Sequence, residues 1–227
     1  MTTPIYLNDE DHRRVSAAVS KAESGTAGEI VTILADRSDG YFDVALVWAA
    51  ITALVALCAM AIAPDFYLHI YEWIAGGWII EWTPRDLFFL AAMVAALKFG
   101  GMLLLQLWVP LRFFLIPGRV KTARVHARAI RAFRIGAESR THGRTGILIY
   151  LSMREHRAEI LADATIAAKV PAEVWGDAMA AMLGELKQGH IANGMIAAIE
   201  QVGVILAENF PRAEDDQNEL PDRLIEV

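Results

Sequence analysis

Hydrophobic positions divide the chain into three parts, of which only the middle one, residues 41–117, is apolar almost throughout. Residues 44–63 are twenty successive residues without a charge. A helix of that length spans about 30 Å, the thickness of the hydrocarbon core of a bilayer. No polar stripe interrupts the segment, as it would in a helix at the surface of a soluble domain. We therefore predict a first transmembrane helix here.

A second span is predicted at residues 87–109, where the one charge is Lys98. Gly100 and Gly101 are small enough to let two helices approach closely. An ionisable residue in a span is a functional hypothesis by default, and here it would mean a transport role. The alternative is that Lys98 snorkels to the interface or pairs with a carbonyl or a second copy, since neither span contains a carboxylate.

The loop between the spans, residues 65–86, is rich in aromatic residues, which suits the headgroup layer. A third span over residues 66–82 is disfavoured by His69, Glu72 and the Gly76-Gly77 pair. The aromatic residues expected to anchor the chain at the interfaces are Trp73, Trp78, Trp82 and Trp108.

The charge pattern predicts the orientation of this two-helix hairpin. Residues 110–134 contain seven Lys and Arg residues and no acidic residue, whereas Arg85 is the one basic residue of this type in the loop. The positive-inside rule then places the loop outside and both flanks in the cytoplasm, as in a multi-pass protein of the cytoplasmic (inner) membrane. The basic residues expected to anchor the chain on anionic lipid are Arg112, Arg119, Lys121, Arg124 and Arg128. The other interpretation of this run is nucleic-acid or regulatory-lipid binding, but a net charge of −6 argues against a nucleic-acid partner.

The flanks read as parts of one α/β domain. Asn8 is a good N-cap for a first helix, and residues 29–35, 146–152 and 157–163 are β-branched or alternating runs that predict strands. Helical periodicity predicts helices over residues 119–138, from Pro171 to Gly189, and from Ile191 to Pro211. We expect a small α/β/α sandwich with a three- or four-stranded sheet, interrupted after its first strand by the hairpin. The predicted boundaries are 1–40 and 118–211 for this domain, 41–117 for the hairpin, and 212–227 for an acidic disordered tail.

A resemblance to a known family rests on an ordered set of residues rather than on one motif. They are Arg140-Thr141, the run 144–149, Ser152, Glu155, Arg157, Glu159-Ile160, Ala162-Asp163, Lys169-Val170, Trp175, Gly189 and residues 206–211, with Gly28 to Val31 as the first strand. This set resembles the TPM domain family, named for thylakoid-lumen phosphatase-like, photosystem-repair and receptor-modulator proteins, in a membrane-inserted bacterial-type member. The resemblance implies an α/β/α sandwich, acid phosphatase-like hydrolysis, divalent-metal binding and roles in the assembly or repair of membrane complexes. An anchor inserted within the domain departs from the usual plan of the family.

The signatures of common hydrolases are missing from the sequence, which has no phosphate-binding loop, nucleophile elbow or zinc-protease motif. A single cysteine, Cys58, excludes a disulfide within the chain. The remaining candidates lie at strand ends or in adjoining loops, where open α/β sheets bind ligands. For metal or ligand binding they are Glu29, Glu155 and Asp163, and for phosphate binding they are Arg140, Arg144 and Arg157. No cofactor follows with certainty, and a hard ion such as Ca²⁺ or Mg²⁺ suits the carboxylates.

Each candidate also has a structural interpretation. Arg144 and Glu155 could pair to close a hairpin, and Trp175 fits a core position better than a stacking platform. The leading hypothesis is therefore a membrane-tethered module for binding, assembly or maintenance of membrane components. Its partners would be the bilayer and other membrane proteins or a second copy of the chain. The alternative is a divalent-metal-dependent phosphatase-like hydrolase, and the remote alternative is a transporter subunit.

Overall fold

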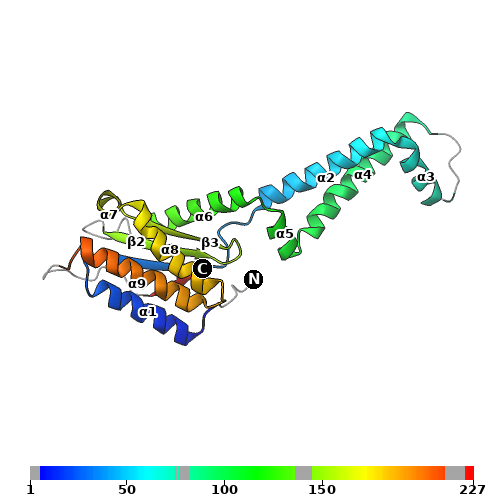
Figure 1. Cartoon of the computed structure of the whole chain (residues 1–227). Coiled ribbons are helices and arrows are strands. Elements are labelled where there is room, and N and C mark those ends of the chain that lie inside the picture. The colour runs from blue at the N-terminus through cyan, green and yellow to red at the C-terminus, as the bar shows by residue number, and fades with distance from the viewer. Residues whose placement is uncertain (1–5, 75, 77–81, 136–144, 213–222) are drawn as a thin grey trace. The chain divides into compact units, whose positions relative to one another are not determined.

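The computed structural model describes residues 6–74, 76, 82–135, 145–212 and 223–227 (Figure 1). The chain forms two compact units. Residues 1–39 and 118–227 make up the first, the α/β unit, and residues 40–117 make up the second, the apolar unit. The second unit is thus inserted in the sequence of the first.

The α/β unit is built on a mixed four-stranded sheet with the order β3-β2-β1-β4. β1 is parallel to β2 and β4, and β2 is antiparallel to β3. The strands are β1 (Glu29–Ala35), β2 (Gly146–Ser152), β3 (Arg157–Ala162) and β4 (Leu224–Glu226). The mixed α/β class and the small sheet agree with the prediction, and β1 and β2 have the predicted bounds.

The fourth strand comes from the segment that was expected to be a disordered tail. Thr32, Ile33 and Leu34 of β1 pair with residues 224–226. Residues 212–223 are acidic and polar, and the apolar pair Leu224-Ile225 that follows them is too short to predict a strand from the sequence. This pair can add to the sheet because β1 is buried and presents an open edge on that side.

One face of the sheet is covered by α1 and α9, with α8 packed on α9 (Figure 1). Ile30 and Leu34 of β1 pack in this core with Met195 and Ile199 of α9. The bounds are α1 (Asp9–Glu23), α7 (Ala164–Lys169), η2 (Ala172–Val174), α8 (Trp175–Leu186) and α9 (Ile191–Asn209). The sequence did not predict α7, and the helix expected to begin at Pro171 is divided between η2 and α8.

The other face carries α6 (Gly118–Phe133), which packs on β2 and β3. Val125, Ala129 and Phe133 of the helix form a second core with Leu148 and Tyr150 of β2. The predicted helix over residues 119–138 extends beyond the described one. Since α6 lies over β2 and β3, it leaves much of β1 and β4 uncovered on this side.

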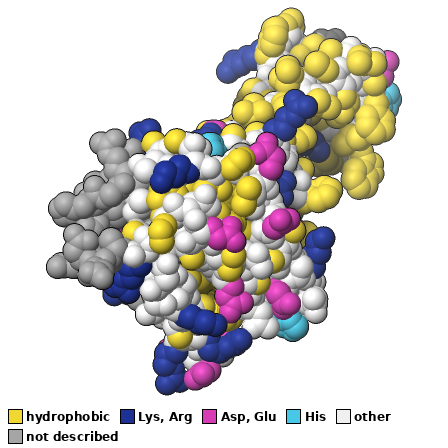
Figure 2. Space-filling view, turned by 60° about the vertical axis from the view of Figure 1, so that its left-hand side comes forward, with side chains coloured by type: hydrophobic (Ala, Val, Ile, Leu, Met, Phe, Trp, Pro, Cys, Tyr) yellow, Lys and Arg dark blue, Asp and Glu magenta, His cyan; other side chains and the backbone are white. Residues whose placement is uncertain are grey.

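The apolar unit contains α2 (Phe42–Ile62) and α4 (Pro84–Leu105), packed against each other, with α3 (Pro64–Ile74) and α5 (Val109–Leu115). Hydrophobic side chains cover its surface, seen at the upper right of Figure 2. Among the described residues, α2, α4 and α9 are long and apolar enough to cross a membrane. About half of the apolar window of α9 is buried inside the α/β unit, so core packing accounts for its composition.

Contacts between α2 and α4 differ from the expected ones. A Cβ at Gly100 or Gly101 would meet no other described atom within 4 Å, so the predicted close approach at these glycines is wrong. The approach is made by α2 instead, where Ala45 and Ala49 are buried. Gln106 also lies at this contact and donates from Nε2 to the carbonyl of Ala45 at 3.2 Å.

The polar and aromatic side chains expected at the membrane lie on the surface of the apolar unit where they are described. Lys98 is exposed on α4. Trp73 and Trp108 are exposed too, and the indole of Trp82 donates to Glu72 at 2.9 Å. Trp78 lies outside the described residues.

Candidate functional site

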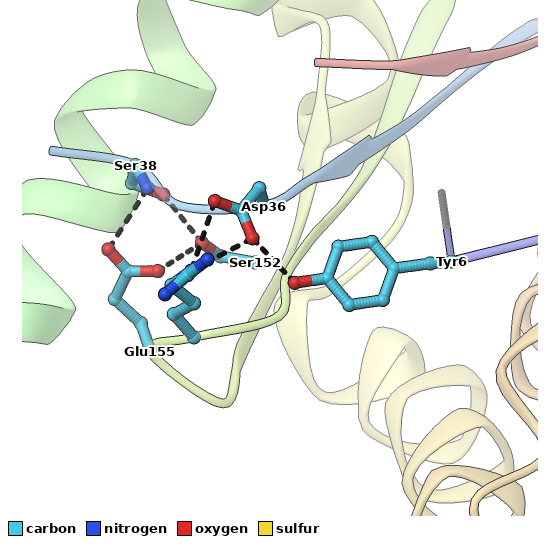
Figure 3. A network of polar contacts seen from close by, with 6 residues as sticks. Tyr6, Asp36, Ser38, Ser152 and Glu155 are labelled. Atoms are coloured by element: carbon cyan, nitrogen blue, oxygen red, sulfur yellow. Dashed lines mark hydrogen bonds and ion pairs between the residues drawn. The ribbon is translucent and has the colours of Figure 1, made fainter. Parts of the chain in front are cut away.

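The carboxyl ends of the parallel strands β1 and β2 carry a network of polar side chains (Figure 3). Asp36, directly after β1, accepts hydrogen bonds from Arg154 Nε at 2.9 Å and 3.0 Å and from the Tyr6 hydroxyl at 2.5 Å. The backbone N–H of Arg154 donates to the Asp36 carbonyl at 3.0 Å. A single carboxylate therefore joins the segment before α1, the end of β1 and the β2–β3 turn.

Electrostatics favour the ionised form of this carboxylate. Burial acts to raise the pKa of Asp36, but the hydrogen bonds from Arg154 and Tyr6 hold it below its usual value. Burial and the neighbouring Asp36 raise the pKa of the Tyr6 phenol to about 12. The hydrogen bond to Asp36 raises the pKa of Arg154 as well. At neutral pH the group is a carboxylate held by a guanidinium and a neutral phenol.

A second part of the network surrounds Ser38, three residues after β1. Its backbone N–H donates to Glu155 Oε1 at 3.0 Å, and its hydroxyl lies 2.9 Å from the hydroxyl of Ser152 and 3.1 Å from that of Tyr150. Ser152 donates to Glu155 Oε2 at 2.6 Å. Ser152 and Glu155 are buried, and burial raises the pKa of Tyr150. The arrangement is suited to holding the chain rather than to attacking a substrate, because the hydroxyl nearest to the base is closed off from solvent.

Two further contacts lie where the chain leaves the α/β unit and where it returns. Arg124 of α6 lies 3.1 Å from Asp39, the last residue before the apolar unit. Arg157 at the start of β3 donates to Thr122 on the first turns of α6 at 3.2 Å. Both junctions with the inserted unit are thus fixed near the same end of the sheet.

The opposite end of the sheet brings two carboxylates into register. Glu29 of β1 pairs with Gly146 of β2. On the opposite edge of β2, the N–H of Asp163 donates to the Gly146 carbonyl at 3.0 Å. Residues facing each other across strands project from the same face, so both carboxylates lie on the α6 side with a glycine between them. Both are buried, at 6% and 4% exposure. Asp163 Oδ1 caps α7 through Ala164 N at 2.9 Å, while Oδ2 is buried without a hydrogen-bond partner among the described residues.

The sequence model of the TPM domain family matches residues 118–205, from the start of α6 into α9. These residues belong to the TPM domain family. The resemblance expected from the sequence is therefore confirmed for these residues, and the match begins directly after the apolar unit.

A solved structure supports the same fold. The chain is similar to the BA42 protein of the psychrophilic bacterium Bizionia argentinensis, determined by NMR, with a TM-score of 0.57 and 18% identity. The likeness covers 100% of this chain and 99% of that chain. At this identity it shows the fold alone. No curated protein matches the chain.

The residues chosen from the sequence are divided between the two ends of the TPM sheet. Glu29 and Asp163 lie at the amino end of β1 and β2, whereas Glu155 and Arg157 lie at the carboxyl end. Arg140 and Arg144 lie outside the described residues. No group of three or more His, Cys, Asp or Glu side chains suited to a metal occurs in the described part of the chain. A divalent ion at the amino end would thus have two protein carboxylates, Glu29 and Asp163, and further oxygens from backbone or water.

Sequence reasoning missed the centre of the network at the carboxyl end. Asp36, Ser38, Arg154 and Tyr6 are not among the candidates that the sequence predicts. A usable signal existed, because Asp36–Ser38 and Ser152 are polar positions at the ends of two strands that become parallel neighbours. Tyr6 could not be found this way, since only the folded chain brings the segment before α1 to this end of the sheet.

Proposed function

We propose that this protein is a membrane-anchored TPM-domain protein of the cytoplasmic membrane that binds membrane components and serves in their assembly or maintenance. The apolar unit would be a two-helix transmembrane hairpin, with the TPM domain on the cytoplasmic side. The observation that carries the proposal is the surface of this unit, where large apolar side chains such as Leu54, Phe88 and Leu104 are more than half exposed. Such a surface is unstable in water and suits lipid.

Two features of the α/β unit support membrane attachment. The contacts Asp39–Arg124 and Thr122–Arg157 fix the chain on both sides of the insertion. In addition, α6 begins directly after the apolar unit and carries the basic run, which would attract anionic lipid at about 1 kcal/mol per charge near the surface. The domain would therefore be held at the membrane surface, where a partner in the bilayer is within reach.

Topology can be tested with single cysteines in a Cys58→Ser background. A membrane-impermeant maleimide is expected to label Phe66→Cys, in the loop region, in intact cells, and to label Val204→Cys, on the exposed side of α9, only after the cells are opened. Carbonate extraction should leave the protein in the membrane fraction. Release by carbonate, or labelling of Val204→Cys in intact cells, would contradict the proposal. Crosslinking in the membrane that recovers no membrane-protein neighbour and no second copy would count against an assembly role.

A divalent-metal-dependent phosphatase-like hydrolase is the second candidate. The observation that favours it is the pair Glu29 and Asp163, which faces one side of the sheet across Gly146, with Asp163 Oδ2 buried and without a hydrogen bond among the described residues. A buried carboxylate oxygen without a donor is costly unless a cation or water satisfies it.

The test is calorimetry of the full chain in nanodiscs with Ca²⁺ and Mg²⁺. Asp163→Asn and Glu29→Gln should abolish binding, while Glu10→Gln, an exposed carboxylate of α1, should not change it. Asparagine is chosen because it caps a helix about as well as aspartate, so a loss of binding would report the charge rather than the cap. If the wild type binds neither ion, or if both variants bind as well as the wild type, this candidate fails. Phosphomonoester hydrolysis is worth measuring only after binding is found.

A further inference from the structure

The α6 side of the sheet has a groove beside the helix. It has a volume of about 250 Å³. It is lined by Val31 and Ile33 of β1, by Ile225 of β4 and Val227 after it, and by Ala132 of α6 and Ile135, which follows that helix. The groove exists because α6 packs on β2 and β3, so that the aliphatic side chains of the neighbouring strands have no helix above them.

Charge on this groove comes from one helix. Arg128 and Arg131 both line it, and residues three apart lie on one helix face. Tyr150 also lines the groove. Burial raises the pKa of its phenol, and the guanidinium of Arg128 acts to lower it. No Asp or Glu is among the described residues that line it. The groove therefore combines an aliphatic lining with two exposed cations.

We propose that this groove binds one acyl chain of an anionic membrane lipid, with the phosphate of the headgroup held by Arg128 and Arg131. This inference deepens the proposed function and rests on it, because a membrane-anchored domain meets such lipids. Guanidinium groups bind phosphate through paired hydrogen bonds. The groove is smaller than the usual pocket of a whole small molecule, which suits a single chain.

The lining also favours an acyl chain over a peptide. An acyl chain has no polar groups, so it can pack against the aliphatic side chains of β1, β4 and α6 without needing a hydrogen-bond partner. A peptide would bring backbone N–H and C=O groups that need partners of their own. Arg128 and Arg131 offer donors only, so they match an anion and leave the donors of a peptide without acceptors.

Photolabelling tests the proposal on the full chain in nanodiscs. The probe is phosphatidylglycerol with a diazirine in one acyl chain, compared with phosphatidylcholine that carries the same chain, and the labelled peptides are mapped by mass spectrometry. We expect phosphatidylglycerol to label residues 31–35 and 224–227 as well as the apolar unit. In the double variant Arg128→Gln/Arg131→Gln, the ratio of groove labelling to labelling of the apolar unit should fall about ten-fold. Lys21→Gln/Lys187→Gln is the matched control, because it removes two exposed cations, on α1 and at the C-terminal end of α8, that lie outside both the groove and the basic run of α6, and it should keep the groove labelling.

Several results would overturn the proposal. Label confined to the apolar unit, equal groove labelling by both lipids, or labelling unchanged in Arg128→Gln/Arg131→Gln would each do so. A crosslink of the groove to a protein segment in place of lipid would show a different occupant. If neither lipid labels the apolar unit, the membrane anchoring itself fails, and this outcome is distinct from loss of the groove label alone.

Discussion

Arg154 binds the carboxylate of Asp36 with one nitrogen, Nε, at 2.9 Å and 3.0 Å from its two oxygens. The two residues are separated in sequence by the whole apolar unit. Their contact therefore joins the part of the α/β unit that precedes the insertion to the part that follows it. The Tyr6 hydroxyl completes the group from a third segment.

Removing the charge at Asp36 should weaken this junction. We expect Asp36→Asn to lower the free energy of unfolding by about 1–2 kcal/mol, less than for a fully buried pair because Arg154 keeps 31% of its side chain exposed. Thermal unfolding in nanodiscs, followed by circular dichroism, measures it. Glu10→Gln removes a shorter but exposed ion pair with Arg13 and should change stability by less than about 0.5 kcal/mol.

The pH dependence of this effect has a defined sign. Because the pKa of Asp36 lies below its usual value, the wild type gains stability above about pH 4 and loses it as the pH falls through the folded pKa. The difference in stability between wild type and Asp36→Asn should therefore shrink on acidification. A difference that grows at low pH would contradict the assignment of the charge.

Tyr6 provides a second titration at the other end of the pH scale. Its pKa of about 12 stands above the ordinary value of 10.0, so the neutral phenol contributes stability below pH 10 that is lost as the pH rises towards 12. An ultraviolet difference titration of wild type against Tyr6→Phe should show this late ionisation. Ionisation of Tyr6 near pH 10 would mean that the bond to Asp36 is not formed in solution.

Close packing of α1 on α9 can be tested with a single methyl group. A Cβ at Gly203 would lie 2.7 Å from the Cβ of Ala22, so Gly203→Ala should destabilise the α/β unit by about 1–3 kcal/mol. Gly184→Ala on α8 is the control, because its Cβ meets no described atom within 4 Å. That substitution should be neutral or raise stability by up to about 1 kcal/mol through helix propensity. Equal effects of both substitutions would contradict the packing of α1 on α9.

A charge introduced in the middle of α2 tests whether this helix inserts into the membrane, because it should raise the free energy of insertion. Val55 is 61% exposed on this helix, and Val55→Arg should disfavour insertion by about 2.5–3.5 kcal/mol if the side chain faces lipid. Ile62→Arg, at the end of the same helix, should cost much less because an arginine there can snorkel. The measurement is the fraction of Phe66→Cys labelled from outside intact cells. Equal labelling in both variants would argue against a membrane-spanning α2.

Much of the fold was predictable because its elements carry local signals. Asn8 caps α1 as expected, and the runs of β1 and β2 are apolar enough to be recognised without neighbours. Two features were not predictable. β4 is only three residues long and depends on pairing with β1, and the α2–α4 contact uses alanines of α2 rather than the glycine pair of α4.

The candidate site was harder to predict than the fold because it depends on register. The sequence places Glu29 at the start of the first strand and Asp163 after the end of the third, but only the pairing of the strands shows that these two positions meet at one end of the sheet, away from Glu155. Burial decides the role of Ser152, which is fully enclosed, and burial is a property of the assembled sheet. The lipid-binding groove likewise follows from the position of α6 on the sheet, which periodicity within the helix does not reveal.

The parallel pairing of β1 has a consequence for synthesis of the protein. Both neighbours of β1, β2 and β4, are encoded after the apolar unit, so a ribosome has made both apolar helices before either partner strand exists. During that interval β1, an apolar strand with two open edges, is exposed to mispairing and to chaperones. The sheet of the α/β unit can therefore be completed only on a chain that already carries both apolar helices.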